Sequence, residues 1–270
     1  MQTRGGACPH TNLRVATLVC GVFLDKYSWR SSIRLMQLKI LSWNIWLDGD
    51  LDAAVEFIKT ANADIIGLQE VIPEREPNII RAIEKLGYES TFSSVIELRE
   101  DGKKMGNAIF SRHRITNTET HVLYDTDKRL SSELERRVAI QVDIRVNDTA
   151  LYIFSTHLAH THQKQSDIQD QQVENLIKLL PQERTIVTGD FNATPDSGVI
   201  KRMRQVMNDS DPGSGPTWSV YPEGCRTCNP QAIDTRLDYI FASRDLKTHS
   251  PAVGNSKASD HLPVSVVVEI

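Results

Sequence analysis

An acid and an amide stand two residues apart in the segment TIVTGDFNATPDS, residues 185–197. The β-branched residues of TIVT predict a strand, and Asp190 and Asn192 follow at its C-terminal end. Because strand side chains alternate between faces, these two side chains point to the same side. Two oxygen-bearing groups placed side by side at a strand end indicate a site. The alternative is that Asp and Asn serve only as turn formers.

Polar residues of the same few types stand at five other predicted strand ends. They are Asn44, Glu70, His157, Asp238 and the pair Asp260–His261. Each has a structural explanation when taken alone, as a cap, a turn residue or a hydrogen-bonded core group. Together they favour a shared site, because a rigid scaffold can hold functional groups at strand ends while the loops vary.

Strands and helices alternate from Met36 onward and must position these residues. Hydrophobic periodicity predicts helices at 51–62, 79–86 and 173–180, and another from about 196. Strands are predicted at 38–46, 64–71, 106–112, 138–146, 151–158, 185–190, 236–242 and 263–270. The Asn147–Asp148 turn makes one antiparallel hairpin. We therefore expect an α/β (α+β) fold with two mixed sheets packed as a sandwich and flanked by helices.

Composition is that of a soluble globular chain, with 270 residues, 40% hydrophobic and 24% charged. The net charge of −4 gives no overall basic field for nucleic acid. No apolar run approaches the roughly 20 residues of a membrane helix. Residues 15–24 have the outline of a signal peptide but lack a small-residue cleavage site. We expect residues 1–35 to be an extension, Met36 the true start of a domain spanning 36–270, and a cytoplasmic location, with export if residues 1–24 are a signal peptide.

Two patterns raise the question of zinc. Cys225 and Cys228 could be a redox pair, a disulfide or half a zinc site, but no second CxxC or His pair at finger spacing accompanies them. In HLAHTH, His160 and His162 share a face of an extended chain that His157 does not, and the motif is not the HxHxDH of zinc hydrolases. We expect His160 and His162 to be exposed loop residues near the substrate.

Over residues 38–270 the chain resembles the endonuclease/exonuclease/phosphatase superfamily of metal-dependent phosphoesterases. The motifs SWN, LQEV, GNAIFSR, STHL, GDFNATPDS, TRLDYIF and SDHLPV occur in the order found in that family. The resemblance implies a DNase I-like sandwich and hydrolysis of a phosphate ester. The substrate class stays open among nucleic acid, phospholipid head groups and small molecules.

The resemblance also implies roles for the strand-end residues. Asn44, Glu70 and Asp260 would bind Mg²⁺ or Mn²⁺, which prefer hard oxygen ligands. Asp190 would activate the attacking water, and Asn192 would hold that water or a phosphate oxygen. His157 and His261 would donate hydrogen bonds to the phosphoryl group, with Asp238 fixing the tautomer and charge of His261. Trp46, His160 and Arg236 would contact the substrate.

One departure from the family pattern bears on which activity within the family this chain has. Trp46 stands where abasic-site endonucleases and tyrosyl-DNA phosphodiesterases tend to have a carboxylate, which counts against the abasic-site function. A sphingomyelinase-like lipid phosphodiesterase is an alternative, although no apolar docking stretch stands out. A catalytically inactive binding scaffold of the same fold is another. We expect a monomer in each case.

Overall fold

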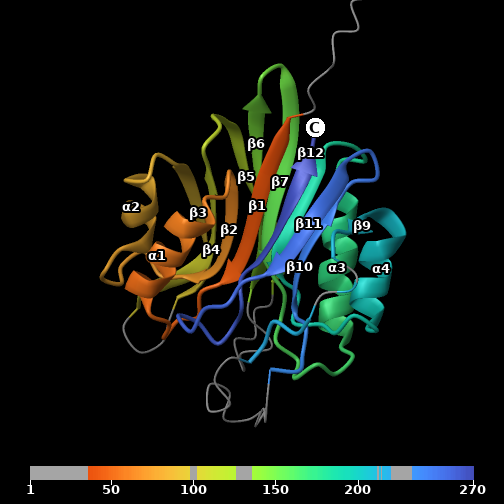
Figure 1. Cartoon of the computed structure of the whole chain (residues 1–270). Helices are drawn as coiled ribbons and strands as arrows, with labels where there is room; N and C mark the ends of the chain where they lie inside the picture. Colours follow the sequence, from red (N-terminus) through yellow and green to blue (C-terminus); the bar gives the residue numbers. More distant parts are fainter. Residues whose placement is uncertain (1–35, 98–101, 126–135, 212, 214, 220–232) are drawn as a thin grey trace, which may run out of the picture. The chain divides into compact units, whose positions relative to one another are not determined.

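Two six-stranded sheets form the frame of the protein (Figure 1). The computed structural model describes residues 36–97, 102–125, 136–211, 213, 215–219 and 233–270. The first sheet has the order β11 (Lys247–Val253), β12 (Val264–Glu269), β1 (Gln37–Asn44), β2 (Ile65–Val71), β4 (Lys104–Ser111) and β3 (Glu89–Glu97). The second has the order β5 (Ile115–Tyr124), β6 (Arg137–Val146), β7 (Thr149–His157), β8 (Thr185–Asp190), β10 (Asp238–Ala242) and β9 (Asn208–Asp209).

Both sheets are mixed. Strands β1 and β2 run parallel, as do β7 and β8, and the other neighbouring strands are antiparallel. In each sheet the parallel pair is central. Because the two strands of the pair run in the same direction, their C-terminal ends lie side by side at one end of the sheet. The predicted sandwich of two mixed sheets with flanking helices is confirmed.

Three hydrophobic clusters define the layers. The cluster between the sheets includes Ile40 and Ile65 from the first sheet and Ile140, Ile153 and Ile186 from the second, all fully buried. A second cluster lies between the first sheet and helices α1 (Leu51–Ala61) and α2 (Ile79–Glu84). A third lies between the second sheet and helices α3 (Asp167–Leu179) and α4 (Gly198–Val206). Figure 1 shows these helix pairs on opposite sides of the sheets.

Side chains at the helix starts fix where the helices begin. Asp50, Asn78, Ser166 and Ser197 each accept a hydrogen bond from a backbone N–H in the first turn of the helix that follows. Helix α1 ends at Asn62, which adopts the left-handed conformation with φ of 50°. In the part of the chain that the structure describes, no helix has the length and apolar character needed to cross a membrane.

The sheets approach each other closely at Gly67 of β2. A Cβ atom at this position would lie 2.1 Å from Oγ1 of Thr188 on β8, which is far inside van der Waals contact. The absence of a side chain there lets the two central strands, and the polar groups at their ends, come together.

Four strands were not predicted from the sequence: β3, β5, β9 and β11. Each is an edge strand and so is paired along only one side. Strand β5 has five consecutive exposed residues, and β11 contains Pro251 and a register shift. Because these strands bury few alternate side chains, they carry little of the period-two pattern from which strands are recognised.

Two predictions concern segments outside the described residues. The extension at residues 1–35 lies there, and so does the pair Cys225 and Cys228. Both remain predictions.

Candidate active site

The polar residues predicted at strand ends come together at one edge of the sandwich. Asn44 and Glu70 come from the central strands of one sheet, and His157 and Asp190 from those of the other. His157 is the register partner of Asp190, and Asp238 pairs with Asp190 from the other side. Nδ2 of Asn44 donates to Oδ2 of Asp190 at 3.0 Å, and this hydrogen bond joins the two sheets at the site.

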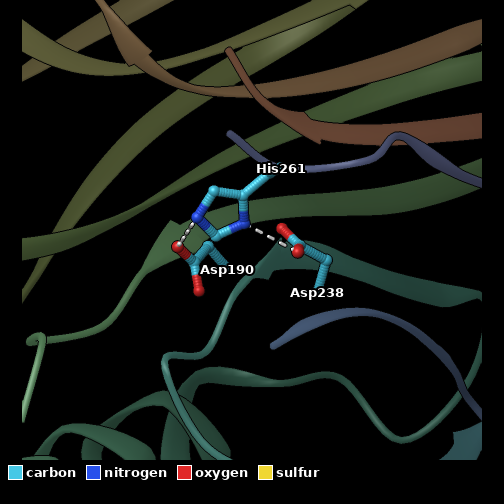
Figure 2. A group of neighbouring side chains, drawn as sticks. All are labelled: Asp190, Asp238 and His261. Atoms are coloured by element: carbon cyan, nitrogen blue, oxygen red, sulfur yellow. Dashed lines mark hydrogen bonds and ion pairs between the residues drawn. The ribbon is translucent and has the colours of Figure 1, made fainter. Parts of the chain in front are cut away.

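The imidazole of His261 lies between two buried carboxylates (Figure 2). Its Nδ1 is 2.8 Å from Oδ2 of Asp238, and its Nε2 is 3.6 Å from Oδ2 of Asp190. Asp190 and Asp238 are directly opposed on antiparallel strands, an arrangement in which like charges repel. Burial alone would lower the pKa of His261, but the charges of Asp238, Asp190 and Asp260 outweigh it and raise that pKa well above its ordinary value. The imidazolium therefore offsets part of the negative charge of the pair and reduces the repulsion between the two carboxylates.

Asp190 is the most connected carboxylate of the site. Its Oδ1 accepts from the backbone N–H of Asn192 at 2.8 Å, and its Oδ2 lies 3.4 Å from Nε2 of His157. Burial raises the pKa of Asp190 to about 7, with the charge of Asp238 acting in the same direction and that of His261 opposing it. A carboxylate with a pKa near neutrality is suited to taking a proton from water.

A second pair of carboxylates lies beside the first. Glu70 is placed by a bulge in β2 and has a φ of 59°, a left-handed conformation that is unusual for Glu. Its Oε1 accepts from Nδ2 of Asn44 at 3.0 Å, and its Oε2 accepts from the backbone N–H of Leu47 at 2.9 Å. Oδ2 of Asp260 accepts from Nε1 of Trp218 at 3.4 Å.

These carboxylates fit a divalent cation. Burial raises the pKa of Glu70, and the negative charge of Asp260 raises it further. Burial also raises the pKa of Asp260. The structure thus places excess negative charge, carried by hard oxygen donors, in a poorly solvated position, which is the chemistry that Mg²⁺ and Mn²⁺ bind. A second group could also hold a metal ion, since ligand atoms of Asp190, Asp238 and His261 lie within 4.8 Å of one another.

Asn192 connects His157, the last residue of β7, with His160 in the segment that follows. Its Nδ2 donates to the carbonyl oxygen of Leu158 at 3.1 Å and faces Nε2 of His157 at 3.0 Å. Its Oδ1 faces Nδ1 of His160 at 3.0 Å. Because a carbonyl can only accept, the amide orientation is fixed, so Nε2 of His157 accepts and Nδ1 of His160 donates. Burial and the charge of Arg137 lower the pKa of His157 well below its ordinary value, which keeps it neutral.

The predicted substrate-contacting residues have different surroundings. The backbone N–H of Trp46 donates to Oδ1 of Asn44 at 3.0 Å, so Trp46 follows the site directly. His160 contacts Asn192, as described above. The guanidinium of Arg236 is buried, pairs with Asp209 at 2.8 Å and lies over the ring of Tyr239 at 4.2 Å. Substrate contact by Arg236 stays a prediction.

Two contributors were not anticipated from the sequence. Oγ1 of Thr217 donates to Oδ2 of Asp238 at 2.6 Å, and Oγ of Ser259 donates to the carbonyl oxygen of Asn44 at 2.7 Å. Thr217 comes from a loop that carries no periodic signal, whereas Ser259 belongs to the SDH motif and stands beside residues that were selected. Trp218 is also buried, and its ring lies 6.4 Å from that of His261.

The sequence and the fold were compared with those of known proteins. A sequence model described as the Endonuclease/Exonuclease/phosphatase family matches residues 41–261. Among curated protein sequences, none matches the chain. The endonuclease/exonuclease/phosphatase from Bacteroides vulgatus is similar in structure, with a TM-score of 0.69 and 18% identity, covering 87% of this chain and 99% of that one.

Two other similar structures have activities in their descriptions. The mannosyl-6-phosphatase Bt3783 of Bacteroides thetaiotaomicron VPI-5482 has a TM-score of 0.64 and 19% identity, covering 86% of this chain and 99% of that one. ANGEL2, a 2',3'-cyclic phosphatase in complex with adenosine-2',3'-vanadate, has a TM-score of 0.64 and 16% identity, covering 88% of this chain and 97% of that one. At these identities the likeness shows that the fold is shared.

Proposed function

Because the chain belongs to the endonuclease/exonuclease/phosphatase family, whose members generally hydrolyse phosphoester bonds, we propose that it is a divalent-metal-dependent phosphoesterase. Its substrate is a phosphodiester or a phosphomonoester. The observation that carries the proposal is the buried Asp190–His261–Asp238 group beside the carboxylates of Glu70 and Asp260.

In this proposal Glu70 and Asp260 hold Mg²⁺ or Mn²⁺, together with Asn44. These residues would hold the ion, and its positive charge would stabilise the charge on a phosphoryl oxygen and on the leaving oxygen. We prefer this set to the Asp190–Asp238–His261 group because both ring nitrogens of His261 already face carboxylates. An imidazole so placed is suited to carrying protons and needs no further cation.

Asp190 accepts the proton of the attacking water in this proposal. Its Oδ1 is held by the backbone N–H of Asn192 and its Oδ2 by Asn44, so the carboxylate has a fixed direction. Asn192 acts through this hydrogen bond and through its contacts with His157 and His160, and so positions the carboxylate. His157, whose Nε2 accepts from Asn192, then supports Asn192 and does not donate to the phosphoryl group.

His261 donates to the phosphoryl group through Nε2. Nδ1 is held by Asp238 at 2.8 Å, whereas Nε2 lies 3.6 Å from Asp190, beyond an ordinary hydrogen bond. An N–H in that position can turn to an incoming phosphoryl oxygen, where it stabilises the negative charge that develops in the transition state. Asp238 keeps the imidazole oriented and charged, helped by Thr217.

Small phosphate esters are the first substrates to test. Two proteins of the same fold are described as a mannosyl-6-phosphatase and a 2',3'-cyclic phosphatase, and both descriptions name small phosphorylated compounds or cyclic esters. A panel should include sugar phosphates, 2',3'-cyclic nucleotides, single-stranded and nicked DNA, RNA, tyrosyl-DNA, sphingomyelin and inositol phosphates. Each is incubated with Mg²⁺ and either wild type or Asp190→Asn. We expect hydrolysis of at least one class by wild type alone.

The panel also separates the alternatives. Turnover of sphingomyelin in preference to the other compounds would favour the lipid phosphodiesterase. A folded wild type that hydrolyses none of them, including bis-p-nitrophenyl phosphate, would support the inactive scaffold and refute the proposal.

A further inference from the structure

Two histidines beside the site face each other with nitrogen atoms in close approach. Nε2 of His160 lies 3.1 Å from Nδ1 of His162, and the rings meet edge to face with centroids 4.6 Å apart. His160 is half-buried and His162 is exposed, so the pair is open to solutes. His162 takes no part in the proton transfers proposed above, and His160 acts there only through its contact with Asn192.

The protonation of His160 is set by Asn192. Because Oδ1 of Asn192 can only accept, Nδ1 of His160 carries a proton and the other ring nitrogen of the neutral ring has a lone pair. Burial and the neighbouring His162 lower the pKa of His160, which favours the neutral ring. A ring that donates through one nitrogen to a fixed oxygen and presents the other nitrogen is the usual state of a metal-binding histidine.

The spacing of the two nitrogens matches a shared metal ion. Zn²⁺ binds imidazole nitrogen at about 2.0–2.1 Å with tetrahedral geometry, which places two such nitrogens about 3.3 Å apart. The observed separation of 3.1 Å between the two nitrogens would have to increase only slightly to bind such an ion. With Nδ1 of His160 donating to Asn192, the Nδ1–H of His162 donates to Nε2 of His160. A metal ion would displace this proton from Nδ1, and the proton would move to Nε2 of His162, so that ring would stay neutral.

A metal ion in this position would lie at the border of the catalytic group. Asn192, which orients His160, also donates its backbone N–H to Asp190. On the other side the His160 ring is 6.3 Å from the ring of Trp218, whose Nε1 contacts Asp260. An ion with open coordination positions here would attract a phosphoryl oxygen away from His261.

We propose that His160 and His162 form a second metal site, selective for imidazole-binding ions such as Zn²⁺, whose occupation inhibits hydrolysis. Imidazole ligands suit Zn²⁺, Cu²⁺ and Ni²⁺, whereas Mg²⁺ prefers oxygen. The site therefore differs in chemistry from the carboxylate site of Glu70 and Asp260. The inhibition rests on the proposed function, but the binding of Zn²⁺ does not.

Binding is tested with the full chain in saturating Mg²⁺. Zn²⁺ is titrated against a chromophoric chelator for wild type, for His162→Ala and for His249→Ala, which removes a partly exposed histidine that contacts Gln37, Ser250 and Glu269. We expect wild type and His249→Ala to bind one Zn²⁺ with the same affinity, and His162→Ala to bind at least about tenfold more weakly, as loss of one of two protein ligands requires. Equal affinity in all three proteins would overturn the proposal.

Inhibition is tested on the same proteins with bis-p-nitrophenyl phosphate. Without Zn²⁺ all three should hydrolyse it at the same rate, because His162 and His249 take no part in the reaction. Added Zn²⁺ should inhibit wild type and His249→Ala but not His162→Ala. Equal inhibition of His162→Ala would place the inhibitory ion elsewhere and contradict the proposal. If no protein is active, the binding titration still decides whether the site exists, while the proposed function fails separately.

Discussion

His261 reduces the repulsion between two carboxylates that the pairing of β8 and β10 brings together. Asp190 and Asp238 are paired across two antiparallel strands of one sheet, and both side chains are buried. A buried charge is tolerated only when it is paired, and the imidazolium between them supplies the pairing. The same geometry leaves Nε2 of His261 directed to the position where the phosphoryl group is proposed to bind.

Removing His261 should reduce catalysis more than it reduces stability. His261→Ala should lower kcat by about 10²–10³, the usual effect of losing one donor to a developing negative charge. Asp238→Asn should have a smaller effect, because the ring remains but loses its orientation. The double variant should be little worse than His261→Ala, since residues that act as a unit are not additive. Multiplicative losses in kcat, measured on folded proteins, would show that the two act separately.

Glu70 should matter for metal affinity and little for folding. Glu70→Gln should raise the Mg²⁺ midpoint of activity by about tenfold or more, since affinity depends on the number of charged ligands. Because burial and Asp260 disfavour the ionised form of Glu70, the free energy of unfolding without metal should be unchanged or higher. Glu74→Gln, an exposed carboxylate close in sequence, is the control. An unchanged Mg²⁺ midpoint in Glu70→Gln would exclude Glu70 as a ligand.

At the level of elements, the parallel pairs β1/β2 and β7/β8 place the site. Each pair brings two strand ends to one edge, and the narrow contact at Gly67 brings the two edges together. These central strands are strongly hydrophobic, so their ends, with Asn44, Glu70, His157 and Asp190, could be predicted from the sequence. The edge strands could not, because they bury too few side chains to show a pattern.

Arg236 shows how a missed element changes the interpretation of a residue. Its partner, Asp209, lies on β9, a strand of two residues with no sequence signal. The sequence therefore predicts a substrate contact for Arg236 but not its ion pair with Asp209. Thr217 was missed for a related reason, because loop residues are brought to the site by tertiary structure alone.

The pairing of Asp209 predicts a dependence of stability on pH. Asp209 joins Arg204 of α4 to Arg236 beside β10, and its side chain is 3% exposed. Burial would raise the pKa of Asp209, but the hydrogen bonds and charge of Arg236 and Arg204 outweigh it and lower the pKa. The stabilisation is therefore complete above the ordinary Asp value of about 3.9 and is lost as the pH falls through the lower folded value.

Asp209→Asn should destabilise the protein by about 3 kcal/mol at pH 7, because two cations lose their buried partner. The difference in unfolding free energy between wild type and Asp209→Asn should shrink toward the lowest pH at which wild type still folds. Urea denaturation at several pH values measures it, with Glu183→Gln as a control for loss of an exposed carboxylate. A difference that stays constant with pH would show that the Asp209 charge is unimportant.

The described residues from Met36 onward include both sheets and the hydrophobic cluster between them. The first buried residue in the described part is Leu38, and Met36 pairs its backbone with Ile270 through hydrogen bonds of 3.2 and 2.9 Å. A protein lacking residues 1–35 should therefore keep the Tm and turnover of the full chain. Insolubility of the shortened protein, or loss of its activity on a substrate that the full chain hydrolyses, would assign residues 1–35 a role in the domain.

We expect this sandwich to hydrolyse phosphate esters with a divalent metal held where the C-terminal ends of its central strands meet. The direct measurement is the rate of bis-p-nitrophenyl phosphate hydrolysis by chelator-treated protein before and after addition of Mg²⁺ or Mn²⁺, for wild type and for folded Asp190→Asn. Hydrolysis by wild type should appear only with added metal, and Asp190→Asn should stay at the background rate. Hydrolysis that persists in the chelator, or that Asp190→Asn retains in full, would contradict this expectation.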